Sequence, residues 1–207
     1  MTITSISSDI NASRSKCNDL MASHRSHGAG HIVQFYDSDV VVIENVSNLA
    51  ECSLRAGDAT ILIATMAHLD SIERRLGSAG LDLGSLRASG LLIALDAADT
   101  LSKLLTENWP DQAKFDDVVG GIVGPAIERS ANGFAFAFGE MVALLCEANQ
   151  SAAAVRLEQL WNGLAKTRHF SLCCAYPLAS FGSTPDLDAV LQICAEHSLA
   201  IPAESLF

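Results

Sequence analysis

Short apolar segments alternate with amphipathic segments from residue 31 almost to the end of the chain. The apolar segments span residues 31–36, 60–65, 90–96, 133–140 and 170–177. Apolar strands that are each followed by an amphipathic helix are typical of a parallel sheet covered on both faces. The alternation therefore predicts an α/β fold of three layers, in which a mostly parallel sheet has helices on both faces.

The segments between the strands carry helix signals. Helices are expected between residues 39 and 57, between 66 and 80, and over 99–105, 111–130, 141–147, 151–167 and 184–198. The glycines and the proline within 120–125 predict that the segment 111–130 is two short helices. Residues 31–207 are expected to form a single domain with a short extended end at 199–202. Residues 1–30, rich in Ser, Asn and Gly, are expected to be a disordered leader.

The charge of the chain excludes some classes of partner. With 13 Lys+Arg and 24 Asp+Glu the formal net charge is −11, which disfavours direct binding to nucleic acid or to an anionic membrane. No apolar stretch approaches the roughly 20 residues that span a bilayer, and the first 30 residues lack the apolar core of a signal peptide. We therefore expect a soluble, cytoplasmic protein without a membrane partner.

The cysteines and histidines show no metal-binding spacing. Six cysteines form no CxxC pair, and we expect reduced, buried thiols. Cys173 and Cys174 are neighbours on a strand, which places their sulfurs on opposite faces. His24, His27 and His31 follow one another closely, but no cysteine or carboxylate has a matching spacing. No metal and no cofactor are expected.

Polar residues stand at or just after the ends of the predicted strands, where ligands of open α/β sheets bind. These residues are Tyr36, Asp37, Thr65, His68, Asp96, Glu140 and Tyr176. A P-loop would place GxxxxGK[ST] after a strand, but the turn at 66–70 reads MAHLD, with no glycine and no lysine. The sequence contains neither that motif nor GxGxxG after any strand. ATP hydrolysis by the P-loop route is not expected.

Further polar residues lie on the expected helix 151–167 and toward the C-terminal end. Glu158, Trp161 and Asn162 project from one side of that helix, where they would line a small pocket or form a surface with a half-buried Trp. Cys174 shares a strand face with Tyr176. His197 follows one turn after Ile193, either as a ligand-binding group or as a histidine bonded to a backbone carbonyl.

Six ordered motifs of this chain resemble the MEDS domain, a family named for methanogens, methylotrophs and the sensory domain of the regulator DcmR. The motifs are HIVQFYD (31–37), IATMAH (63–68), FGEM (138–141), LEQLWN (157–162), LCCAYP (172–177) and ICAEHS (193–198). The resemblance covers residues 30–200. It implies a RecA/KaiC-like α/β fold without a phosphate-binding loop, and a signalling role in sensing small hydrocarbon derivatives.

The resemblance also implies a candidate sensory pocket. Carried over position by position, its residues are His31, Tyr36, His68, Glu140, Glu158, Trp161, Asn162, Cys174, Tyr176 and His197. Where family members are expected to place an arginine before the position of Glu140, this chain reads FAFAF (134–138). A charge partner for Glu140 is therefore expected to be missing, which weakens any assignment of an anionic ligand.

Three functions remain open from the sequence. The first is a stand-alone, non-enzymatic sensor that binds a small, mostly apolar organic ligand and regulates a partner histidine kinase or transcription regulator. This hypothesis expects no output domain in the chain itself, so that the signal passes through a separate partner or a homo-oligomer. The second is a degenerate RecA-like nucleotide-binding protein, or a protein–protein adaptor, without hydrolysis. The third is a hydrolase or transferase that uses Asp96, Glu140 and Glu158, which requires two of these carboxylates to converge.

Overall fold

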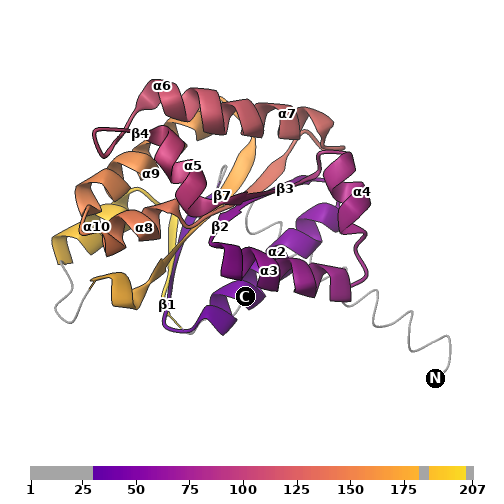
Figure 1. Cartoon of the computed structure of the whole chain (residues 1–207), viewed down its shortest axis with the longest axis horizontal. Helices are drawn as coiled ribbons and strands as arrows, with labels where there is room; N and C mark the ends of the chain where they lie inside the picture. The colour runs from indigo at the N-terminus through magenta and orange to yellow at the C-terminus, as the bar shows by residue number, and fades with distance from the viewer. Residues whose placement is uncertain (1–29, 182–186, 204–207) are drawn as a thin grey trace.

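The computed structural model describes residues 30–181 and 187–203, and a parallel sheet of six strands forms its centre. The strands are β1 (His31–Tyr36), β2 (Ala59–Ala64), β3 (Leu92–Asp96), β6 (Ala135–Gly139), β7 (Phe170–Pro177) and β8 (Leu199–Ile201). Their order across the sheet is β3-β2-β6-β7-β1-β8 (Figure 1). Neighbouring strands all run in the same direction, so their carboxyl ends share one edge.

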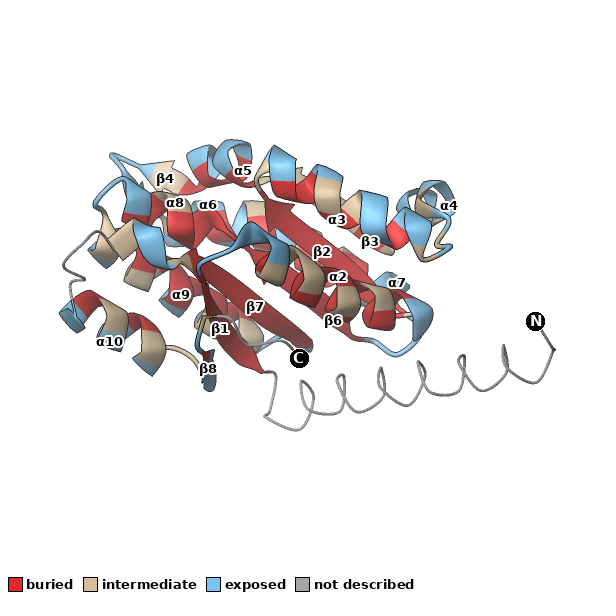
Figure 2. Ribbon diagram, turned by 90° about the horizontal axis from the view of Figure 1, so that it is seen from below, coloured by how far each residue is buried: buried red, intermediate tan, exposed pale blue. Residues whose placement is uncertain are grey.

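The structure confirms the predicted α/β fold with its three layers. Helices α2 (Asp39–Arg55), α3 (Met66–Ser78) and α4 (Leu83–Ala88) pack on one face. The other face carries α5 (Ala97–Leu104), α6 (Gln112–Phe115), α7 (Gly121–Arg129), α8 (Met141–Glu147), α9 (Ser151–Ala165) and α10 (Leu187–Ala195). Buried residues form the sheet and the helix sides that face it (Figure 2). The apolar core is thus divided into two halves by the sheet.

The predicted strands agree closely with the observed ones. Residues 31–36 and 170–177 have the predicted bounds, and the other three long strands differ by one or two residues at their ends. Strands β2 and β6 are buried along their whole length, as expected for the middle of a covered sheet. The leader expected at residues 1–30 falls, except for Gly30, outside the described residues.

Between residues 105 and 130 the structure differs from the prediction. Strands β4 (Leu105–Thr106) and β5 (Trp109–Pro110) form a small antiparallel hairpin. Its two turn residues, Glu107 and Asn108, have φ angles of 51° and 62°, the left-handed conformation of a two-residue hairpin turn. Glu107 gives no turn signal in the sequence, because glutamate seldom adopts this conformation.

The glycine-rich segment after the hairpin is more helical than predicted. A π-helical turn at Asp116–Gly120 joins α6 to α7, and Pro125 lies inside α7. The helix was expected to break at the glycines and the proline. Instead it continues through a π-helical turn, which is wider than an α-helical turn. Such π-turns occur as single-turn insertions within helical segments.

In the part of the chain that the structure describes, the cysteines with free thiols follow the prediction. Cys146, Cys173 and Cys174 are buried, Cys194 is half-buried, and Cys173 and Cys174 face opposite halves of the core. Cys52 departs from the prediction, because it takes part in a disulfide. No spacing in the sequence marks it for that bond.

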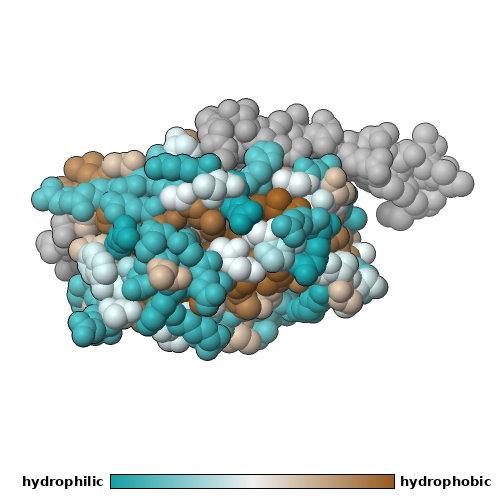
Figure 3. Space-filling view, turned by 90° about the horizontal axis from the view of Figure 1, so that it is seen from above, coloured by the Kyte–Doolittle hydropathy of each residue, from teal (hydrophilic) through white to brown (hydrophobic). Residues whose placement is uncertain are grey.

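The face of the molecule that carries α6 and α7 is mostly polar (Figure 3). The view onto the side of α6 and α7 shows hydrophilic residues with only scattered apolar patches between them (Figure 3). Among the described helices, none combines the length and the apolar composition that a membrane crossing needs.

Candidate functional site

Two places on the carboxyl edge of the sheet have the topology that favours ligand binding. Strands β2 and β6 are neighbours, but α3 follows β2 on one face and α8 follows β6 on the other. Strands β1 and β7 are related in the same way, through α2 and α10. Ligands of open α/β proteins bind at such switch points, because the two connections diverge there.

Glu140, the residue after β6, links the two strands of the first switch point. Its Oε2 accepts a hydrogen bond of 2.8 Å from the backbone N–H of Thr65, which follows β2. Its Oε1 lies 2.5 Å from Nδ1 of His68. The Thr65 hydroxyl caps α3 by accepting from the backbone N–H of His68, so His68 is held in the first turn of that helix. The Glu140–His68 pair is buried.

The electrostatics of this pair favour a charged imidazole. The hydrogen bond to Glu140 raises the pKa of His68 above its ordinary value, and this effect exceeds the opposing effect of burial. Nε2 of the same ring lies 3.5 Å from Oδ1 of Asp39, whose side chain is 69% exposed. The Tyr36 ring centroid lies 6.4 Å from the His68 ring, and burial, with Glu140, raises the pKa of the Tyr36 hydroxyl. A chain of polar groups thus runs from buried Glu140 to the surface.

Exposed apolar side chains stand at this same edge. Val40, Met66 and Leu178 are 67%, 56% and 39% exposed. Each lies within four residues after a strand end, those of β1, β2 and β7 respectively. Exposed apolar groups close to a few polar groups are the usual composition of a small-molecule site.

A second polar cluster lies inside the half of the core that contains α9. Glu158 of α9 has no solvent exposure and faces strands β1 and β7. Its Oε1 accepts a hydrogen bond of 2.7 Å from the Tyr176 hydroxyl, and its Oε2 lies 3.2 Å from Sγ of Cys174. Nε2 of His31 lies 3.1 Å from Oε2, and Nε2 of His197 lies 3.4 Å from Oε1.

Glu158 dominates the electrostatics of this cluster. Burial alone would raise its pKa, but the adjacent His197 and His31 outweigh burial and hold the pKa well below the ordinary value. Burial and the carboxylate together raise the pKa of the Cys174 thiol and of the Tyr176 hydroxyl. For His197, burial acts to lower the pKa, but Glu158 raises it overall.

Each histidine of the cluster is oriented through its Nδ1 atom. His197 Nδ1 donates to the backbone carbonyl of Ile193 at 2.6 Å. His31 Nδ1 lies 2.8 Å from Oδ1 of Asn162, whose Nδ2 donates to the Glu196 carbonyl and carboxylate, at 2.9 Å each. These bonds direct both Nε2 atoms toward Glu158.

The structure thus divides the ten predicted residues into two groups and one core residue. Tyr36, His68 and Glu140 lie at the carboxyl edge, whereas His31, Glu158, Asn162, Cys174, Tyr176 and His197 form the internal cluster. Trp161 packs edge-on against Phe115 and lies next to Phe170, and it is 1% exposed, not half-buried. Its role is to fill the core.

Sequence reasoning missed two residues that contact the predicted site. It also expected, wrongly, that Glu140 has no charge partner. Neither Asp39 nor Glu196 was predicted as a site residue, although Glu196 lies inside the ICAEHS motif. The charge partner of Glu140 is present, because His68 occupies that role. His68 and Glu140 are 72 residues apart, so only the folded chain shows that they pair.

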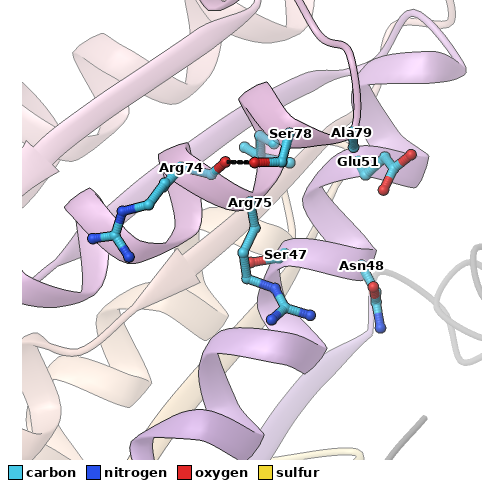
Figure 4. Close-up of a pocket in the computed structure, with 8 residues that line it drawn as sticks. Ser47, Asn48, Glu51, Arg74, Arg75, Ser78 and Ala79 are labelled. Atoms are coloured by element: carbon cyan, nitrogen blue, oxygen red, sulfur yellow. Dashed lines mark hydrogen bonds between the residues drawn. The ribbon is translucent and has the colours of Figure 1, made fainter.

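A surface hollow between α2 and α3 lies apart from both groups. It is lined by Ser47, Asn48, Glu51, Arg74, Arg75, Leu76, Ser78 and Ala79 (Figure 4). None of the ten predicted residues lines it, and Arg75 is paired with Glu44 on the neighbouring helix. We therefore assign no ligand to it.

The comparison with protein families agrees with the motifs and the fold. Residues 30–197 match the model of the family described as MEDS, "MEthanogen/methylotroph, DcmR Sensory domain". The chain belongs to the MEDS family. The match includes both polar groups, from His31 to His197, and supports a sensory role in signalling for this domain. No curated protein matches the chain.

Proposed function

We propose that this MEDS domain is a non-enzymatic sensor that binds a small, mostly apolar organic molecule at the carboxyl edge between β2 and β6. Its bound state regulates a separate signalling partner, such as a histidine kinase or a transcription regulator. The observation that carries the proposal is the buried Glu140–His68 pair at a switch point whose edge also exposes Val40, Met66 and Leu178. Family membership supports the sensory role.

The contacts at this edge offer a way to convert binding into a change of shape. Glu140 holds the start of α3 through Thr65 and His68, and Asp39 connects the start of α2 to the same imidazole. A ligand that accepts or donates a hydrogen bond here competes with one of these contacts. It then shifts the equilibrium between arrangements of α2 and α3, because it binds one arrangement more tightly than the other.

The nucleotide alternative is less well supported. A phosphate-binding loop directs free backbone N–H groups at phosphate oxygens. At the corresponding turn the Thr65 N–H is bonded to the Glu140 carboxylate, whose negative charge also repels phosphate.

The three carboxylates required by an acid–base enzyme have separate partners. Asp96 accepts from the backbone N–H of Asp99 at the start of α5, Glu140 pairs with His68, and Glu158 lies in the internal cluster. Among the described residues they share no hydrogen-bond partner. We therefore assign them no catalytic role.

The proposal is tested by the thermal unfolding midpoint of the purified chain against a panel of probes. The panel contains small alcohols, halocarbons, carboxylic acids and magnesium nucleotides. A molecule that binds only the folded state raises the midpoint in proportion to its saturation. We expect a neutral organic probe to raise it, and magnesium nucleotides to leave it unchanged.

A matched pair of variants locates the binding site. Met66→Ser removes an exposed apolar group at the proposed edge, whereas Leu191→Ser removes one on α10, where Leu191 is 66% exposed. The organic probe should lose its effect in the first variant and keep it in the second. A response to nucleotides alone, or equal responses in both variants, would overturn the proposal.

A further inference from the structure

We propose that His31, Glu158, Cys174 and His197 bind one divalent transition-metal ion of the zinc class inside the core of this domain. The four side chains come from β1, α9, β7 and the second residue after α10. Because they are far apart in the sequence, no local motif predicts the site. The proposal departs from the expectation, based on sequence spacing, that the chain holds no metal.

The spacing of the four donor atoms suits a tetrahedral ion. One nitrogen, oxygen or sulfur atom from each residue can be chosen so that all four lie within 4.8 Å of one another. The shortest separations are 3.1 Å between His31 Nε2 and Glu158, 3.2 Å between Glu158 and Cys174 Sγ, and 3.4 Å between His31 Nε2 and Sγ. Zinc bonds of roughly 2.0–2.3 Å in a tetrahedron place ligand atoms about 3.3–3.8 Å apart. Small movements of these side chains, which open the shortest separations and close the longest, would therefore complete the coordination shell.

The histidine tautomers leave lone pairs directed at the centre of the cluster. His197 Nδ1 bonds a carbonyl, which only accepts, so Nδ1 carries the hydrogen and the Nε2 atom of the neutral ring carries a lone pair. That Nε2 atom has no hydrogen-bond partner among the described residues, and its side chain has no solvent exposure. It faces a carboxylate oxygen at 3.4 Å, so either a proton on the ring or a metal ion between the two atoms must supply the positive charge there.

His31 is oriented in the same way. The Asn162 amide donates through Nδ2 to Glu196, which leaves its Oδ1 as the acceptor for His31 Nδ1. Nε2 of His31 is then the atom that faces Glu158 and Cys174. Histidines that bind metals use their second nitrogen in this manner, and ligating carboxylates are also hydrogen-bonded, as Glu158 is by Tyr176.

The donor set indicates both the metal class and the role of the site. Two imidazoles, a thiolate and a carboxylate suit zinc better than magnesium or calcium, which prefer oxygen alone. Four protein ligands with buried side chains are typical of a closed, structural site. A metal here would fix the segment after α10, and with it β8, to the β1–β7 part of the sheet. His197 and Ser198 lie between α10 and β8, and Ser198 donates its N–H to the His31 carbonyl.

Cobalt(II) and zinc(II) are suitable probes of the full chain after treatment with a chelator and a reducing agent. We expect one equivalent of Co²⁺ to bind and to give the near-ultraviolet absorption of a cobalt–thiolate bond, with the intense visible bands of a tetrahedral site. One equivalent of Zn²⁺ should remove both signals. Failure of the parent chain to give a thiolate–cobalt signal would overturn the proposal, whatever the stability of the variants.

Variants then assign the ligands. Cys174→Ala should abolish the thiolate signal, His197→Gln should weaken Co²⁺ binding by more than about 100-fold, and Asn162→Ala, which only positions His31, by roughly 10- to 100-fold. The controls are Cys194→Ala, a thiol of α10 outside the cluster, and a His24→Ala/His27→Ala double variant of the N-terminal histidines. Both controls should keep the signal of the parent. Loss of the signal in either control, with Cys174→Ala unchanged, would place the metal elsewhere.

Discussion

Glu140 and Glu158 are both buried carboxylates next to histidines, but they differ in how they connect to solvent and to the rest of the chain. Glu140 accepts from a backbone N–H and from one imidazole, which leads through Asp39 to the surface. Glu158 is surrounded by four side chains from β1, β7 and the segment after α10, all inside the core. The first environment is suited to respond to a ligand, and the second to hold elements together.

The largest expected effect comes from removing the internal carboxylate. Glu158→Ala leaves two buried histidines, a thiol and a hydroxyl without their common partner, and removing one member of a buried charged set is strongly destabilising. We expect the free energy of unfolding to fall by about 3–5 kcal/mol, measured by urea denaturation at pH 7. The matched change at the edge, Glu140→Ala, should cost less, because His68 retains Asp39 and contact with water.

Equal losses of unfolding free energy for Glu158→Ala and Glu140→Ala would contradict the distinction between the two groups. A conservative control, Glu158→Gln, keeps the volume and one acceptor for Tyr176, and should therefore destabilise the chain less than Glu158→Ala. If the two Glu158 variants were equally destabilised, the charge of the carboxylate and not its contacts would account for the whole effect.

The two tyrosines, one in each group, should differ in how much their hydroxyls contribute to stability. The Tyr176 hydroxyl donates to Glu158 at 2.7 Å, whereas the Tyr36 hydroxyl has no hydrogen bond within the described part of the chain. A hydrogen bond to a charged group contributes roughly 1.5–3 kcal/mol. Tyr176→Phe should lower the free energy of unfolding by that amount in denaturant titrations, and Tyr36→Phe should change it little. The reverse order would contradict the assignment of Tyr176 to the internal cluster.

The dependence of stability on pH tests the edge pair. In the folded chain the pKa of His68 is raised above its ordinary value of 6.5 by the hydrogen bond to Glu140. The stability that this pair contributes is then fully present below pH 6.5 and is lost as the pH rises through the folded-state pKa. Unfolding experiments across this range should show the decline in the parent chain.

His68→Gln is the control for this prediction. Glutamine can still donate to Glu140 but does not titrate, so the component of the decline due to His68 should disappear. His197 also has a raised pKa and contributes a decline of the same sign, which this variant leaves in place. An unchanged pH profile in His68→Gln would assign the whole dependence to the internal cluster.

The sheet could be predicted from sequence because each of its five long strands is a continuous apolar run between helix signals. Strand and helix patterns are local, and residues 31–36 and 170–177 match the observed strands. The hairpin at 105–110 and the π-turn at 116–120 were missed because they depend on backbone conformations that Glu107 and Asp116 do not signal. Local patterns contain little information on such departures.

The site was predicted as a set of residues but not as an arrangement. Motifs selected His31 and Tyr36 from the same strand, yet period 2 places them on opposite faces of the sheet, and the partners of each then differ. Which helix covers which face depends on the long connections between strands, and no local pattern of the sequence records this. The division into two groups therefore required the folded chain.

The smallest expected effect on stability comes from Asp39, the exposed residue that contacts the Glu140–His68 pair. Asp39 is 69% exposed and its Oδ1 lies 3.5 Å from His68 Nε2, so Asp39→Asn should change the free energy of unfolding by less than about 0.5 kcal/mol. Its negative charge nevertheless adds to the raised pKa of His68, so the substitution should lower that pKa, as followed by NMR titration of the His68 ring. Asp37→Asn removes a nearby exposed carboxylate with no ion pair to His68 and should lower it less. Equal shifts of the His68 pKa in the two variants would mean that His68 responds to the general charge of the loop. The specific line of polar contacts from Glu140 through Asp39 to the surface would then be wrong.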